Sequence, residues 1–121
     1  MPLRAQRGLD SGAEVRAEAI DERMTDGYLE ALGMRDGSPR FDFLVFDATH
    51  WTYSFPPEHQ VFRPADPADS TAFFLRVPGE LEKLHNRYLN AVHFVDAQIE
   101  RILQGLEETG HMEDTVVIVV G

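Results

Sequence analysis

The chain has 121 residues, of which 43% are hydrophobic and 26% charged, a composition typical of one folded globular domain. Eleven Lys and Arg against 21 Asp and Glu give a formal charge of −10, which argues against nucleic acid as a partner because phosphate backbones are bound by clustered cations. The absence of cysteine excludes disulfides, thiolate metal sites and cysteine nucleophiles.

The N-terminal third predicts a tail followed by one helix. Residues 1–10 show no periodicity, and we expect them to be disordered. SGAE at 11–14 reads as a capping box, and apolar residues then recur at helical spacing up to Leu32. Gly33 is a suitable C-terminal cap, so the pattern predicts a helix over 11–32.

The rest of the chain predicts a βαβ unit. FDFLVFD at 41–47 is a nearly continuous apolar run, as in a strand covered on both faces, and TVVIVV at 115–120 is a second one. Prolines make 48–79 a long irregular loop, and apolar residues stepping by three or four predict a helix over 80–109. The expected fold class is therefore α/β with parallel strands, and it is part of a larger sheet because two buried strands need neighbours.

Candidate site residues follow the first predicted strand. In open α/β sheets, ligands bind beyond the carboxyl ends of the strands, which favours Asp47, Thr49, His50 and Tyr53. His50 has two interpretations, either a packed loop histidine or a group that contacts a ligand. Asp47 is better explained as a side-chain cap of the following turn.

The other histidines and Asp96 are interpreted as structural. His59 has no partner at metal-ligand spacing, and His85 and His93 lie about 12 Å apart along the predicted helix, too far to share an ion. His111 is assigned to a surface turn. Asp96 interrupts the apolar stripe, and we expect it to hydrogen-bond a neighbouring loop. No GxSxG, P-loop, GxGxxG or DxDxDG motif is present.

Two stretches resemble one known family. NRYLNAVHFVDAQIERILQGLEETGHMEDTVVIVVG resembles the late segment of the sulfatase and alkaline-phosphatase superfamily, in which a helix and a strand precede a metal-binding Asp-His-Gly. FDFLVFDATHWTYSFPPEHQVF is similar to the stretch in which a strand ends in a histidine that reaches the anionic group of the substrate, and His50 occupies that position. The proline-rich loop looks closest to membrane-anchored sulfatase-like proteins of the bacterial inner membrane, whose domain faces the periplasm.

This resemblance implies a partial three-layer αβα fold of the alkaline-phosphatase type. It also implies a fragment, because no CxPSR-like nucleophile segment occurs and the Asp-His-Gly would begin directly after Gly121. His50 alone is carried over, as an anion or substrate contact, and we expect no metal ligands and no cofactor in this chain. A full-length parent would hold a divalent cation (Ca, Mg, Mn or Zn). The chain shows neither a signal nor a membrane anchor or span.

Three hypotheses for the function remain. The first is a fragment of a sulfatase-family hydrolase acting on sulfate or phosphate esters, inactive alone because a histidine cannot replace the nucleophile and the metal. The second is a non-catalytic module that binds an anion or a lipid head group. The third is a truncated product that self-associates through exposed strand edges.

Overall fold

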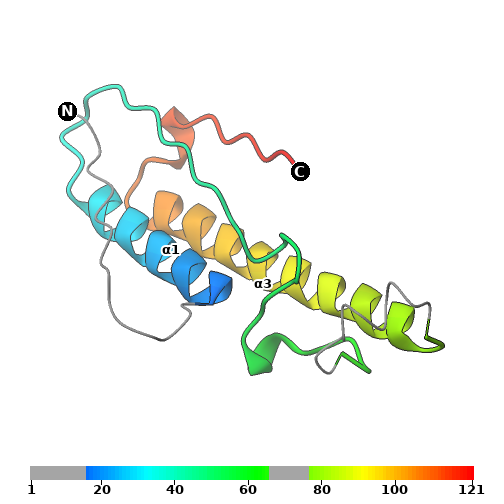
Figure 1. Ribbon diagram of the computed structural model, residues 1–121. Helices are drawn as coiled ribbons and strands as arrows, with labels where there is room; N and C mark the ends of the chain where they lie inside the picture. The colour runs from blue at the N-terminus through cyan, green and yellow to red at the C-terminus, as the bar shows by residue number, and fades with distance from the viewer. Residues whose placement is uncertain (1–15, 66–76) are drawn as a thin grey trace.

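The computed structural model describes residues 16–65 and 77–121 (Figure 1). Over these ranges the chain forms two α-helices and two short 3-10 turns. In chain order they are α1 (Ala17–Gly33), η1 (Pro57–His59), α3 (Glu80–Glu108) and η2 (Met112–Asp114). The predicted tail at 1–10, the capping box at 11–14 and part of the predicted loop lie outside the described residues.

α1 has a buried face that is polar at its start and apolar at its end. Glu18, Asp21 and Thr25 are all buried, and their spacing of three and four residues places them on one side of the helix. Leu32 continues this face at the C-terminal end of the helix. The helix stops at Gly33, where the following N–H bonds back to the last turn.

α3 is a single helix of 29 residues, about 43 Å long. It begins after Gly79, whose φ of 85° is in the left-handed region that favours glycine, and Gly110 (φ 72°) follows its end. Its buried side chains are Leu84, Asn90, Ala91, Phe94, Gln98, Ile102 and Leu106.

The core lies where α1 packs against the C-terminal half of α3 (Figure 1). Leu32 of α1 meets Ile102 and Leu106 of α3, and Tyr28, Leu44, Phe46 and Met112 pack around this cluster. Gly105 permits the close approach of the helices, because a Cβ at that position would overlap the side chain of Leu29. The core therefore joins both helices to the segments that precede the candidate site and follow α3.

The predicted α/β fold is wrong. The described residues contain no strand and no sheet, so neither the βαβ unit nor the partial three-layer αβα arrangement is present. Segments 41–47 and 115–120 are extended, but no backbone hydrogen bond joins one to the other. A strand requires a hydrogen-bonded partner, whereas the β-branched and aromatic content of a segment expresses only a preference.

The two extended segments also leave much apolar surface uncovered. Leu44 and Phe46 face the helices, while Phe41 is 89% exposed and Val116 is 86% exposed. Continuous hydrophobicity at 41–47 therefore does not mean burial on both faces. The predicted self-association through strand edges has no strand among residues 16–65 and 77–121 to act through. Neither described helix is both long and apolar enough to cross a bilayer.

Candidate functional site

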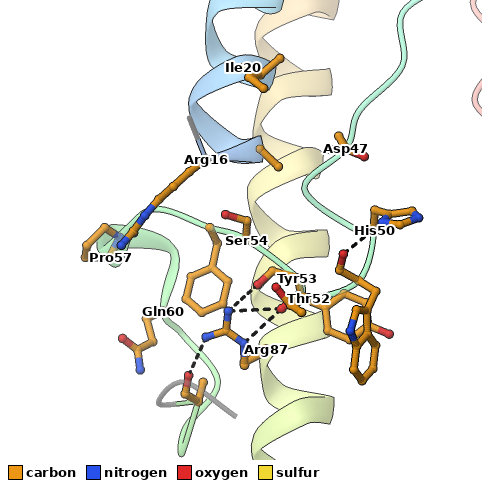
Figure 2. A pocket seen from close by; sticks show the side chains of 14 residues that line it. Arg16, Ile20, Asp47, His50, Thr52, Tyr53, Ser54, Pro57, Gln60 and Arg87 are labelled. Atoms are coloured by element: carbon orange, nitrogen blue, oxygen red, sulfur yellow. Dashed lines mark hydrogen bonds between the residues drawn. The ribbon is translucent and has the colours of Figure 1, made fainter. Parts of the chain in front are cut away.

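A cavity of about 660 Å³ lies between the start of α1, the loop that follows residue 47, and α3 (Figure 2). Its polar lining includes Arg16, Asp47, His50, Ser54, Gln60 and Arg87. Trp51, Phe55 and Ile20 add apolar surface. The cavity therefore contains the position at which the sequence predicted a site.

Asp21 fixes the start of the loop that carries His50. Its carboxylate accepts hydrogen bonds from the backbone N–H of Asp47 at 3.0 and 3.1 Å and of Ala48 at 2.8 Å. The side chain is 1% exposed. Burial raises the pKa of this carboxyl above its ordinary value, although the two amide hydrogen bonds act in the opposite direction.

The loop then turns through its own backbone. The N–H of His50 donates to the carbonyl of Asp47 at 2.9 Å, and the N–H of Tyr53 donates to the carbonyl of His50 at 2.7 Å. Tyr53 has a φ of 59°, and the N–H of Ser54 bonds back to Ala48 at 2.9 Å. The sequence predicted that the side chain of Asp47 caps this turn. In the structure the backbone carbonyl of Asp47 accepts the hydrogen bond, and the carboxylate lines the cavity instead.

His50 is exposed, and one ring nitrogen is held by the loop. Its Nδ1 lies 3.0 Å from the carbonyl oxygen of Trp51 (Figure 2). Because a carbonyl can only accept, Nδ1 carries the proton in this contact, which leaves Nε2 as the ring nitrogen available to a ligand. Neutral Nε2 accepts a hydrogen bond or a proton, and protonated Nε2 donates to an anion.

Arg87 of α3 holds the far wall of the cavity. Its guanidinium donates to the carbonyls of Thr52 (3.3 Å), Tyr53 (2.7 Å) and Ala65 (3.4 Å), as Figure 2 shows. It also lies 5.5 Å from the ring centre of Phe55. Burial lowers the pKa of Arg87 from its ordinary value, and nearby Glu18 acts in the opposite direction. With its donors committed to the loop, Arg87 shapes the cavity.

Of the two arginines in the described part of the cavity lining, Arg16 is the one open to solvent. Its guanidinium lies 3.6 Å from the Glu18 carboxylate, and its side chain is 76% exposed. The other Glu18 oxygen accepts a hydrogen bond from the hydroxyl of Ser54. In Figure 2 Arg16 extends toward Pro57, and His50 lies across α3 in that view. A ligand that contacts both side chains would therefore have to span the cavity.

The remaining predicted residues fall outside this cavity or play other parts. Tyr53 lines the cavity, whereas Thr49 does not. The hydrogen bond expected from Asp96 to a loop is absent from the described part of the chain, and Asp96 is exposed at the edge of the buried stripe. The sequence missed Asp21 and Arg87, and helical spacing with Glu18 and Thr25 was the available signal for Asp21. From the sequence, His59 was interpreted as lacking a partner, whereas the structure brings it into contact with His93.

Comparison with known proteins identifies the class. A family model described as Sulfatase matches residues 4–121, which is nearly the whole chain. The chain therefore belongs to the sulfatase family. Neither the curated proteins nor the solved structures give a match.

Membership in this family implies a metal-dependent parent enzyme. Across residues 16–65 and 77–121, no group of three or more His, Asp or Glu side chains could hold a metal ion. Among the described residues that line the cavity, only Asp47 and His50 are of ligand type, and both oxygens of nearby Asp21 accept backbone N–H groups. The described residues therefore do not by themselves make a divalent-cation site of the kind that hard cations require.

Proposed function

We propose that this chain is part of a sulfatase-family hydrolase acting on sulfate or phosphate esters, and that the cavity beside His50 receives the anionic group of the ester. The family match supports the hydrolase class. The observation that carries the site is the bonding of His50, whose Nδ1 is held by the Trp51 carbonyl at the edge of the cavity. That bond places the proton on Nδ1 and leaves Nε2 available to the ligand.

The chemistry of the cavity suits an anion. Protonated Nε2 of His50 would donate a charge-assisted hydrogen bond to a sulfate or phosphate oxygen, which is stronger than a neutral one. Arg16, largely in solvent, would attract the same charge. Proton transfer to a leaving group by such an imidazole typically contributes about 10²–10⁴-fold to a rate.

We expect the 121-residue chain alone to bind the anion without hydrolysing an ester. The nucleophile of the family is a modified cysteine or a serine or threonine in an upstream segment, and this sequence has no cysteine and no CxPSR-like segment. Among the described residues, the cavity places two groups of metal-ligand type together but not a third. Acid–base chemistry at His50 does not substitute for a placed nucleophile and a cation that takes up developing charge.

A non-catalytic role in binding a lipid head group is the second candidate. The observation in its favour is that Trp51, 42% exposed, and Phe55 line the same cavity as Arg16. Apolar surface beside a cation suits a phosphate that is attached to an acyl chain. In this case the chain would bind the head group and release it unchanged.

Isothermal titration calorimetry with inorganic sulfate, inorganic phosphate and a short-chain anionic phospholipid tests both candidates. We expect saturable binding that His50→Gln weakens about tenfold, because one charge-assisted hydrogen bond is lost. His111→Gln is the matched control, since His111 is not part of the cavity lining. Absence of saturable binding, or an equal loss in both variants, would overturn the site. Binding of the lipid but of neither inorganic anion would favour the second candidate.

The proposed location is the bacterial inner membrane, with this part of the protein on the periplasmic side. The support is the resemblance of the proline-rich loop to sulfatase-like proteins of that membrane. Protease treatment of intact and permeabilised spheroplasts of the native host provides the test. Digestion of the native protein in intact spheroplasts is the expected result, and protection until permeabilisation would contradict it.

A further inference from the structure

A second cluster of ligand-type side chains lies between η1 and α3. Nδ1 of His59 lies 2.9 Å from Nδ1 of His93, although the two residues are 34 positions apart in the chain. The ring centres are 5.1 Å apart, and the ring planes are inclined by 58°. His59 is not part of the cavity lining, while Pro57 and Gln60 on either side of it are. This pair is therefore separate from the site beside His50.

Buried groups hold the two imidazoles at this spacing. Phe94, which is fully buried next to His93, meets the ring of His59 edge-on at 5.3 Å between ring centres. Asn90, one turn before His93 and also fully buried, accepts hydrogen bonds from the N–H groups of Val61 (2.9 Å) and Phe62 (2.8 Å). The backbone that carries His59 is thereby tied to the helix that carries His93.

The spacing is one that a metal ion would use. Imidazole nitrogens bind such ions at about 2.0–2.1 Å, so two of them in adjacent square-planar or octahedral positions lie about 2.9 Å apart, and about 3.3 Å apart in a tetrahedral site. A hydrogen bond between the two Nδ1 atoms uses one proton and one lone pair. A metal ion would lie beside the pair and bind both Nδ1 lone pairs once the shared proton has moved to Nε2 of its own ring.

We propose that His59 and His93 form a two-imidazole site for a late divalent transition-metal ion, with water in the other positions. Imidazole suits copper, nickel and zinc, whereas magnesium and calcium select oxygen ligands. The affinity order for divalent ions places copper(II) above both nickel(II) and zinc(II), and the spacing favours tetragonal over tetrahedral geometry. This site is independent of the proposed ester chemistry, because none of its ligands lines the cavity.

Calorimetric titration of the tag-free 121-residue chain with Ni²⁺ or Cu²⁺ in a non-coordinating buffer tests the site. We expect one equivalent of metal to bind. His59→Gln and His93→Gln should each weaken the affinity by at least about tenfold, because loss of a group that only supports a metal ligand already costs that much. His85→Gln is the matched control, since His85 is an exposed histidine of the same helix. This variant should bind the metal ion with the affinity of the unsubstituted chain.

Electron paramagnetic resonance of the unsubstituted chain loaded with Cu²⁺ tests the site without any substitution, so it does not depend on whether a variant folds. Pulsed spectra should show couplings from two imidazole nitrogens. Circular dichroism of each variant, with helix content equal to that of the parent, shows that a loss of affinity is local. A spectrum with one imidazole, no binding at roughly millimolar metal, or an affinity unchanged in both His→Gln variants would overturn the proposal.

Discussion

The carboxylate of Asp21 lies 2.8 Å from the backbone nitrogen of Ala48, 27 residues further along the chain. The same side chain accepts the N–H of Asp47, and it is almost fully buried. This contact links α1 to the segment that leads into His50. Stability and the geometry of the candidate site therefore depend on one carboxylate.

Replacing Asp21 by Asn should destabilise the fold by about 1–3 kcal/mol at neutral pH. The amide has one acceptor oxygen instead of two, and its NH₂ group would face a backbone donor. Urea unfolding followed by circular dichroism measures the change. Asp96→Asn, at an exposed position on α3, is the control and should stay within about 0.5 kcal/mol of the parent. Equal stability of the two variants would contradict the role assigned to Asp21.

Asp21 should also give stability an unusual dependence on pH. Because burial raises its pKa, the folded state holds the proton more tightly than the unfolded state does. The proton-linked part of its contribution to the free energy of unfolding is therefore complete below the unfolded pKa of about 3.9 and is lost as the pH rises through the raised value. The hydrogen bonds from Asp47 and Ala48 remain at neutral pH. The difference between the unfolding free energies of the parent chain and Asp21→Asn isolates this contribution. We expect that difference to shrink as the pH rises above about 4, and growth over the same range would show the opposite shift.

Asn90→Ala should release the segment that follows η1. Asn90 accepts the N–H groups of Val61 and Phe62 and donates to the carbonyl of Phe62 at 2.9 Å. Its loss leaves these groups unpaired at a cost of about 1–3 kcal/mol. Amide hydrogen exchange should accelerate at Val61 and Phe62. Asn86→Ala, which removes one exposed bond to the Pro64 carbonyl, should leave both amides protected.

Arg87→Lys should loosen the cavity wall although it conserves the charge. A lysine ammonium lacks the planar fork with which Arg87 reaches three carbonyls while lying over Phe55. We expect a loss of about 1–3 kcal/mol in urea unfolding, together with weaker anion binding. The control is Arg63→Lys, at an exposed position that donates to one carbonyl. A change in Arg87→Lys no larger than in the control would mean that Arg87 does not hold this loop.

Local signals in the sequence located the long helix but not its buried face. The predicted helix over 80–109 and α3 at Glu80–Glu108 begin at the same residue. Tyr88 and Val92 belong to the apolar residues at helical spacing that predicted this helix and its buried stripe, yet they are 43% and 39% exposed, and Asn90 and Gln98 are buried instead. A count of apolar residues cannot find this face, because its polar groups are satisfied by hydrogen bonds: Asn90 by a distant loop and Gln98 by Arg101 of the same helix.

The errors that remain concern contacts between distant residues. The composition of 41–47 and 115–120 favours strands, but pairing depends on a neighbour that a local pattern does not specify. His59 was interpreted as lacking a partner because ligand spacing was sought along the chain, whereas η1 carries it to His93 through space. His50 was favoured both by its position after the predicted strand and by the family resemblance; it lines the cavity, and its contact with an anion stays a prediction.

A ¹⁵N NMR titration of the histidine side chains with inorganic sulfate tests most directly whether the cavity beside His50 receives an anion. We expect a saturable shift of His50 Nε2, a smaller shift of Nδ1, which is bonded to the Trp51 carbonyl, and stationary signals from His85 and His111. A His50 signal that does not saturate, or shifts of equal size at all three histidines, would contradict it.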